Sequence, residues 1–284
     1  MNEPFGMRLK KAMEKYGPLC AGIDPHPSLL NAWGLSDNVA GLREFTNRCL
    51  EAFLGNVAAI KPQSAFYERH GSAGLAVLED ALRVSQESDT QSILDVKRGD
   101  IGSTMAGYAQ AFLSPGSPFE ADAITLSPYL GFDSLNPAYD LARENGKGIF
   151  VLCLTSNPEG ASVQHAQTPA GNSVAADIAT GAAKFNQEHT PAGQMGSLGL
   201  VVGATVGDSV LTQRVNLPAV NGPFLAPGLG AQGGSIAEVK AIFTSALPNV
   251  LASSSRGILG FGPKIEDLKA AAIKESKALQ NSLV

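Results

Sequence analysis

The chain is poor in several residues and patterns that would define its class at once. It has three cysteines, and Cys20, Cys49 and Cys153 form neither a C-x-x-C pair nor the spacing of a disulfide framework. We expect them to be buried as small apolar residues. The start of the sequence has no secretory apolar segment, and no apolar run reaches about 18 residues. A cytoplasmic protein without a membrane span is therefore expected.

Basic charge is also scarce. The sequence holds 21 Lys and Arg against 26 Asp and Glu, which gives a net charge of −5 at pH 7. A general nucleic-acid-binding protein needs a basic face to neutralise phosphates, so that function is not expected. A phosphorylated small molecule stays open as a ligand, because one phosphate requires only a local cluster of amides and one arginine.

Short apolar runs alternate with segments of helical periodicity along the chain, which is typical of a parallel sheet built from βα units. We interpret eight runs as strands, namely 19–23, 57–61, 92–97, 123–127, 149–154, 198–203, 223–226 and 250–253. No G-x-G-x-x-G follows the first run. The pattern therefore favours a closed (β/α)₈ barrel over a doubly wound open sheet, and we expect residues 1–284 to form one such domain.

Several helices between these runs carry recognisable signals. Residues 5–17 (FGMRLKKAMEKYG) are predicted to form an amphipathic helix that ends at a glycine. Apolar residues at helical spacing mark a helix through 39–53, for which Ser36 is the candidate cap. Ser235 and Glu238 resemble a capping box that opens a late helix.

The connection after the fifth strand, residues 155–195, is unusually long. Its first half is polar and interrupted by proline and glycine, and its second half is rich in alanine and predicted to be helical. A long loop at the C-terminal face of a barrel is either a lid over the site or a passive surface insertion. The sequence leaves both interpretations open.

Charged residues fall at the ends of successive predicted strands, where barrel enzymes carry their chemistry. Lys61 ends the second strand, Asp95 and Lys97 lie in the third, and Asp100 follows it. Residues two apart on a strand point to the same side, so we expect two cations and two carboxylates to alternate in one pocket. The alternative is an ion-pair network that closes the barrel. Because desolvation often exceeds the Coulombic gain of buried ion pairs, a chemical role is favoured.

The late glycine-rich segments predict a phosphate site. Glycines 228, 230, 233 and 234 allow close backbone approach, Gln232 offers an amide donor, and Arg256 offers a guanidinium. The loops after strands seven and eight are the usual phosphate position in this fold, although plain tight turns are the alternative.

A metal site beginning with Asp24 and His26 is the weaker interpretation of another pattern. Such a site in a barrel would need further histidines at strand ends, and the other three, His70, His165 and His189, are expected in loops or helix ends. We therefore predict no metal site, with His26 as a loop residue.

Five segments carry a resemblance to a known family. The segment DVKRGDIGST, residues 95–104, resembles the D-x-K-x-x-D-I-x-x-T signature of orotidine 5′-monophosphate decarboxylases. LCAGIDP at 19–25, AIKPQSAFYE at 59–68, TLSPYLG at 125–131 and APGLGAQGG at 226–234 resemble the second class of that family, found in mycobacteria and other bacteria. The likeness runs through nearly the whole chain. It implies decarboxylation of orotidine 5′-monophosphate to uridine 5′-monophosphate in de novo pyrimidine biosynthesis, without a cofactor.

The same resemblance implies roles for the charged residues. Lys97 would protonate C6 of the pyrimidine, Asp95 would lie against the departing carboxylate, and Lys61 would hold the array and reach the ribose. Asp100 and Thr104 would be supplied across a homodimer interface to complete the neighbouring site.

The substrate contacts that the resemblance implies are Asp24 to the ribose hydroxyls, Ser127 to the pyrimidine edge, and Gln232 and Arg256 to the phosphate. Decarboxylation leaves negative charge at C6 with no group placed to delocalise it well, so preorganised electrostatics is the chemistry that such an array offers. Neither a Schiff base nor a metal is required by these residues.

Three rival functions remain as alternatives. A Mg²⁺-dependent phosphosugar decarboxylase or aldolase would favour a Glu ligand at the first or second strand, where Asp24 and Lys61 stand. Schiff-base chemistry through Lys61 or Lys97 is disfavoured by the aspartates, which keep both lysines charged. A catalytically inactive nucleotide-binding protein would bind nucleotide without turnover.

Overall fold

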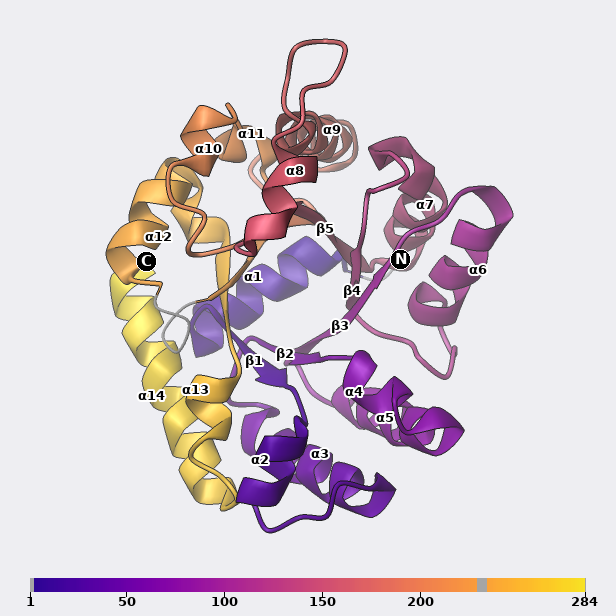
Figure 1. Cartoon of the computed structure of the whole chain (residues 1–284), viewed down its shortest axis with the longest axis vertical. Helices are drawn as coiled ribbons and strands as arrows, with labels where there is room; N and C mark the ends of the chain where they lie inside the picture. Colours follow the sequence, from indigo (N-terminus) through magenta and orange to yellow (C-terminus); the bar gives the residue numbers. More distant parts are fainter. Residues whose placement is uncertain (1–2, 229–233, 284) are drawn as a thin grey trace.

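Eight parallel strands form a closed barrel at the centre of the molecule (Figure 1). The structure is a computed structural model that describes residues 3–228 and 234–283. Each strand pairs with the next, and β8 pairs with β1. The strands are β1 Leu19–Ile23, β2 Ala59–Pro62, β3 Gln91–Arg98, β4 Ala123–Leu126, β5 Gly148–Leu154, β6 Leu198–Val202, β7 Phe224–Pro227 and β8 Val250–Ser254. The predicted (β/α)₈ barrel and its eight strands are confirmed.

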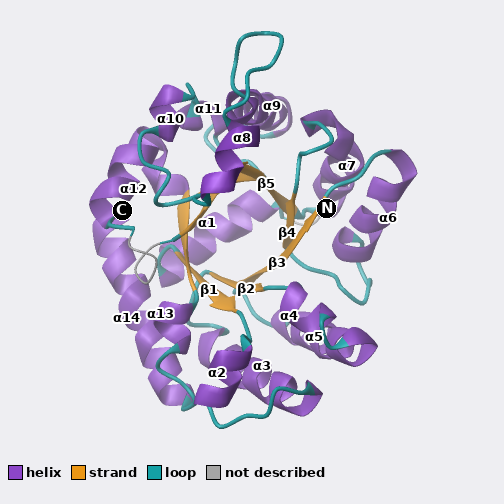
Figure 2. Cartoon of the chain, in the orientation of Figure 1, coloured by secondary structure: helices purple, strands orange, loops and turns teal. Residues whose placement is uncertain are grey.

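Helices surround this barrel on all sides (Figure 2). The longer ones are α1 Phe5–Tyr16, α3 Val39–Phe53, α5 Gly71–Ser85, α6 Gly102–Leu113, α7 Asn136–Asn145, α9 Val174–His189, α12 Ile236–Phe243 and α14 Ile265–Leu283. Short helices lie in the connections: α2 Pro27–Ala32, α4 Ala65–Glu68, α8 Ala161–Gln164, α10 Ser209–Thr212, α11 Leu217–Val220, α13 Arg256–Leu259, and the 3₁₀ turns η1 Phe132–Leu135, η2 Pro158–Gly160 and η3 Thr244–Asn249. No helix in the described ranges is long and apolar enough to cross a membrane.

The predicted helix signals hold with one correction. Ser235 and Glu238 form the predicted capping box of α12. The cap of α3 is Asn38 and not Ser36, because α3 begins at Val39 and the Asn38 side chain accepts a hydrogen bond from the Gly41 amide at 3.0 Å. A cap acts on the amides two or three residues along the helix, which Ser36 lies too early to reach.

Helix α1 closes the N-terminal end of the barrel. As predicted, it is amphipathic and ends at a glycine, Gly17. Its buried residues Phe5 and Leu9 pack with inward-facing strand residues such as Phe150, whose ring meets Phe5 edge-on at 6.0 Å. A Cβ on Gly148 would lie 2.1 Å from the Phe5 ring, so only glycine fits there. The interior is therefore filled at this end, and space remains at the carboxyl ends of the strands.

The long connection after β5 contains η2 and α8 in its first half and α9 in its second, which confirms the predicted alanine-rich helix. The segment between α8 and α9 loops outward beyond the ring of helices (Figure 1). The three cysteines are free and buried, as predicted.

Candidate active site

A cavity of about 400 Å³ opens at the carboxyl ends of the strands. It is lined by Asp24, His26, Lys61, Asp95, Lys97, Thr125, Val201, Leu225, Pro227, Gly228, Ser253, Ser254, Ser255, Arg256 and Gly257. Most of the polar lining comes from the ends of β1 to β4 and from the end of β8 with the segment after it. The charged half of the cavity is the part lined by Lys61, Asp95 and Lys97, and the lining near β8 is rich in serine hydroxyls.

Asp95 is the centre of the charged half. Its side chain is only 8% exposed and accepts hydrogen bonds on both oxygens. Oδ2 accepts from Lys61 Nζ at 2.8 Å and from Gln63 Nε2 at 2.9 Å. Oδ1 accepts from Lys97 Nζ at 2.5 Å and from Thr125 Oγ1 at 2.8 Å. Each oxygen thus has one cationic and one neutral donor, which fixes the plane of the carboxylate.

Strand β3 is irregular where it presents this group. Leu94 pairs with Ile124, but the next pairing joins Arg98 to Leu126, so four residues of β3 span two of β4. Within this bulge Lys97 has a φ of 44°, a left-handed conformation that costs a lysine about 1–3 kcal/mol. Its amide donates to Thr125 Oγ1 at 3.0 Å. Bulges of this kind re-aim side chains next to active sites, and here the bulge carries Lys97.

The charges of this cluster support one another. Burial alone would raise the pKa of Asp95, but the ammonium groups of Lys61 and Lys97 hold that pKa well below its usual range. Burial alone would lower the pKa of Lys61, but the carboxylates of Asp95 and Asp24 raise it well above its usual range. Both groups therefore stay ionised across the physiological pH range.

Two further predicted residues line the same cavity. Asp24 follows β1, and its Oδ1 is buried without a hydrogen-bond partner among the described residues. Arg256 is exposed at the start of α13. Next to it, the buried Ser255 Oγ also has no described partner. Buried polar atoms are normally satisfied, so these two mark positions where a ligand can complete the bonding.

The structure does not bring three predicted residues to this cavity. Asp100 accepts a hydrogen bond from the amide of Ile101 at 2.8 Å and lies outside the lining. Thr104 is exposed on α6. Ser127 follows the end of β4, where its amide donates to the Arg98 carbonyl at 2.8 Å. Within one chain, three of the four predicted charges meet.

Two glycines lie where backbone segments come close together. Gly99 allows such an approach, because a Cβ there would lie 2.3 Å from the Ser127 carbonyl oxygen. Gly228 lines the cavity, and its carbonyl accepts from the Gly234 amide at 3.0 Å. Gln232, predicted to contact phosphate, lies outside the described residues.

The sequence interpretation missed Gln63, Thr125 and the hydroxyls of residues 253–255. Gln63 lies two residues after Lys61, so the same alternation that selected Lys61 could have found it. Thr125 occupies the inward register of β4, two residues before Ser127, which was chosen instead. The serines were visible as SSSR after the last strand but carried no signal of their own.

Within residues 3–228 and 234–283, no three His, Cys, Asp or Glu side chains lie close enough together to hold a metal ion. His26 lines the cavity and packs edge-on against Phe66, with ring centroids 4.3 Å apart.

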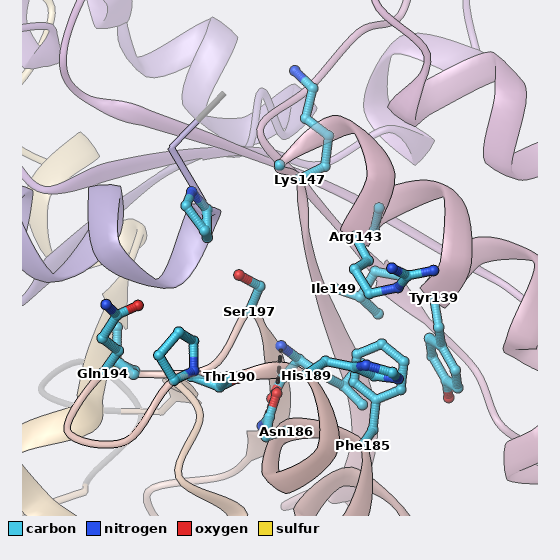
Figure 3. A pocket seen from close by; sticks show the side chains of 16 residues that line it. Tyr139, Arg143, Lys147, Ile149, Phe185, Asn186, His189, Thr190, Gln194 and Ser197 are labelled. Carbon is cyan, nitrogen blue, oxygen red and sulfur yellow. Dashed lines mark hydrogen bonds between the residues drawn. The ribbon is translucent and has the colours of Figure 1, made fainter. Parts of the chain in front are cut away.

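A second, smaller cavity of about 80 Å³ lies between α7 and α9, near the start of β5 and β6 (Figure 3). Tyr139, Arg143, Phe185 and His189 gather on one side of it, and none of its lining residues is acidic. Lys147, also in the lining, is paired with Glu120 at 2.7 Å. This cavity lies at the amino ends of the strands, away from the usual place of barrel chemistry.

Comparisons with known proteins agree on one family. The model of the orotidine 5′-phosphate decarboxylase / HUMPS family matches residues 17–271. The orotidine 5′-phosphate decarboxylases of Salinispora arenicola and Streptomyces coelicolor are 53% and 52% identical to the chain over 270 residues, 95% of this chain and of each relative. A provisionally named orotidine 5′-phosphate decarboxylase from Streptomyces avermitilis has a TM-score of 0.94 at 50% identity, covering 99% of this chain and 96% of that one. The matched region includes every residue that lines the larger cavity.

Proposed function

Because the chain belongs to the orotidine 5′-phosphate decarboxylase / HUMPS family, we propose that it converts orotidine 5′-monophosphate to uridine 5′-monophosphate in de novo pyrimidine biosynthesis. The observation that carries the proposal is the row of charges formed by the buried Lys61 and Asp95 and the half-exposed Lys97, beside a cavity of about 400 Å³. The relatives that are 52–53% identical along 95% of the chain carry that activity in their names. No cofactor is part of the proposed chemistry.

The proposed reaction centres on Lys97. The C6–carboxylate bond of the pyrimidine breaks, its electron pair stays at C6, and CO₂ leaves. Lys97 Nζ then gives a proton to C6, which forms the new C–H bond and leaves a neutral amine. A fixed ammonium beside C6 stabilises the developing carbanion, and in a pocket that excludes water such an interaction is stronger than in solution. The 46% exposure of the Lys97 side chain leaves it facing the space that the ring would occupy.

Asp95 has a different part in the proposed reaction. It is ionised, and all of its described contacts are donors, so a substrate carboxylate brought against it meets a fixed negative charge. That repulsion is relieved when CO₂ leaves, while Lys61 and Lys97 keep the charge of Asp95 balanced. In this proposal Asp95 favours departure of the carboxylate, and Lys61 holds Asp95 in place and reaches the ribose.

The remaining groups fit the rest of the nucleotide. Asp24 Oδ1, buried without a described partner, is suited to accept from ribose hydroxyls. Arg256 and Ser255, which follow β8 and also line the cavity, are suited to phosphate oxygens, which accept forked guanidinium and hydroxyl donors. Gln232 is the further proposed phosphate donor, and Ser127 is the proposed contact to the pyrimidine edge. Binding of the distant phosphate would then contribute to the rate as well as to affinity.

We further propose that the active species is a homodimer in which Asp100 and Thr104 complete the neighbouring site. Both lie outside the cavity of their own chain. They are flanked by three exposed apolar side chains, since Ile101, Tyr129 and Leu130 are 61%, 77% and 54% exposed. The loops that carry them are adjacent, because a Ser127 amide bonds to the Arg98 carbonyl. An exposed apolar cluster next to incomplete catalytic charges fits a contact between two copies of the chain.

The test is the loss of ultraviolet absorbance of orotidine 5′-monophosphate with catalytic amounts of protein in excess EDTA. Wild type is expected to convert it to uridine 5′-monophosphate, and Lys97→Ala is expected to lose at least about 10³-fold in kcat. Binding of uridine 5′-monophosphate to Lys97→Ala, measured by calorimetry, should weaken far less than turnover. The exposed Lys184→Ala serves as the matched control and should behave as wild type.

Two results would contradict the proposal. A folded wild-type protein that leaves the substrate unchanged would refute the activity and redirect attention to phosphosugars with Mg²⁺ restored. Equal losses of binding and turnover in Lys97→Ala would refute the proton-donor role and leave Lys97 as a binding group.

A further inference from the structure

The hydroxyl of Thr125 makes two hydrogen bonds in the charged cluster, one with the backbone of Lys97 and one with the Asp95 oxygen that the Lys97 side chain also contacts. It accepts a hydrogen bond from the Lys97 backbone amide at 3.0 Å and donates one to Asp95 Oδ1 at 2.8 Å. The Lys97 ammonium donates to the same Asp95 oxygen at 2.5 Å. The contacts therefore close a ring that runs from Thr125 to the Lys97 backbone, along its side chain to Asp95, and back to Thr125.

We propose that Thr125 is a positioning residue for Lys97, fixing both its strained backbone and the oxygen that orients its ammonium group. The inference rests on the proposed function for its catalytic consequence. Thr125 acts through Lys97 and Asp95, and it needs no contact of its own with the reacting atoms.

The backbone contact matters because β3 leaves its regular pairing at this point. Between Leu94 and Arg98 no ladder pairing to β4 is made, so the Lys97 amide has no strand carbonyl opposite it. The Lys97 amide is partly buried, an amide shielded from water without an acceptor is unfavourable, and a left-handed lysine persists only where its surroundings hold it. Thr125 Oγ1 supplies that acceptor.

The side-chain contact matters because the two Asp95 oxygens are held unequally. Oδ2 is held by Lys61, whose side chain is 9% exposed, and by Gln63. Oδ1 is held by Lys97, whose side chain is 46% exposed, and by Thr125, which is 1% exposed. Without the hydroxyl, the only described donor left on Oδ1 is the half-exposed Lys97 ammonium, which Asp95 must itself orient.

A hydroxyl suits this position because it offers one donor and two acceptor lone pairs. Valine has nearly the same shape but neither function, and serine keeps both functions but lacks the methyl group. The pair of variants Thr125→Val and Thr125→Ser therefore separates the hydroxyl from the volume of the side chain.

The first measurement is steady-state decarboxylation. Thr125→Val is expected to lose about 10–100-fold in kcat, the usual effect of removing a group that orients a catalytic residue, with KM changed less than about threefold. Thr125→Ser should stay within about threefold of wild type in both parameters. Thr46→Val is the matched control, because Thr46 on α3 is equally buried but bonds to the Leu42 carbonyl and to the Tyr67 hydroxyl of α4, away from the cavity.

The second measurement does not depend on turnover. Hydrogen exchange of the ¹⁵N-labelled Lys97 amide is expected to be at least about tenfold faster in Thr125→Val than in wild type, Thr125→Ser or Thr46→Val, since the amide has lost its acceptor. An inactive wild type would refute the proposed function, and this exchange rate would still decide whether Thr125 holds Lys97.

The inference is overturned if Thr125→Val keeps wild-type kcat and amide protection. It is also overturned if Thr125→Ser is as impaired as Thr125→Val, because the loss would then follow from volume, or if KM rises as much as kcat falls. Should Thr125→Val fail to fold, Thr125→Ala removes the same hydroxyl without adding a methyl group to the site, and the same two readouts apply.

Discussion

A network of charged side chains lies at each end of strands β3 and β4, and the two networks are built differently. At the amino ends, Asp122 accepts from Arg8 at 2.6 Å and from the amide and hydroxyl of Ser92 at 2.9 and 3.0 Å. Arg8 also donates to Gln91 Oε1 and to the Gly146 carbonyl, at 2.7 and 3.1 Å. This network, called the lower network below, ties α1 to the barrel, and the fold itself supplies hydrogen-bond partners for both Arg8 and Asp122.

At the carboxyl ends, the network of Lys61, Asp95 and Lys97, called the upper network below, is left open on one side. Lys61 and Lys97 converge on Asp95, but Lys97 is strained and half exposed to a cavity. Asp24 Oδ1 and Ser255 Oγ face the same cavity region without described partners. A network that the fold completes stabilises the fold. A network that contains a strained residue and unsatisfied polar atoms beside a cavity is suited to be completed by a ligand. This is the physical basis for assigning function to the upper network.

Among the changes that compare the two networks, the largest effect should come from removing the charge that the upper network is proposed to receive from a second chain. Asp100→Ala alone is expected to lose at least about 10²-fold in kcat/KM, because the neighbouring site lacks its second carboxylate. Mixed with Lys97→Ala under conditions that exchange subunits, it should regain activity, since one site of each heterodimer then has all four charges. Activity is measured by the absorbance assay after mixing.

The matched control for this experiment is a mixture of Asp95→Ala with Lys97→Ala. Asp95 and Lys97 both act in the site of their own chain, so each site of the heterodimer lacks one of them and no activity should return. If verified subunit exchange gave no recovery with Asp100→Ala either, Asp100 would not be shared between chains. The upper network would then be complete without a partner.

A smaller effect, on stability instead of activity, is expected from the lower network. Asp122→Ala leaves Arg8 and the Ser92 amide without their acceptor and should lower the free energy of unfolding by about 3 kcal/mol. Values of kcat and KM should stay within about twofold of wild type. The measurement is urea denaturation beside steady-state kinetics, with the exposed pair variant Asp140→Ala as a control expected to change stability by less than about 0.5 kcal/mol. A large loss of activity in folded Asp122→Ala would break the distinction between the two ends.

The upper network was largely predictable from the sequence because its members lie at strand ends. Short apolar runs located the strands, alternation along the third placed Asp95 and Lys97 on one side, and Lys61 was found at the end of the second. The resemblance pointed to Ser127 at the end of the fourth predicted strand, but β4 ends at Leu126, so Thr125 is its last inward residue. The end of a strand depends on its neighbours, which a single sequence does not contain.

Other features were beyond prediction because they depend on contacts between distant segments. The bulge of β3 exists only relative to its pairing with β4, and its sequence, DVK, carries no glycine or proline to mark it. The lower network joins Arg8 to Asp122, which are 114 residues apart. The sharing of Asp100 and Thr104 between two chains was implied by the resemblance to a family, since nothing in the isolated chain gives them a shared site.

The smallest effect, and the one that most directly distinguishes the two ends, is the pH dependence contributed by Asp95. Its pKa in the folded protein is held below that in the unfolded chain, which is about 3.9 for an ordinary aspartate. The ionised group therefore stabilises the fold fully above that value, and this contribution is lost as the pH falls towards the folded-state pKa. Wild type should lose stability relative to Asp95→Asn below about pH 4, by at most about 1.4 kcal/mol per pH unit, whereas the difference should stay constant between about pH 5 and 8. Urea midpoints of the two proteins at pH 7, 5 and 3.5 measure this, with the exposed Asp140→Asn as control. A stability difference between wild type and Asp95→Asn that is the same at all three pH values would mean that Lys61 and Lys97 do not hold Asp95 ionised. The upper network would then lack the fixed charge on which its proposed chemistry depends.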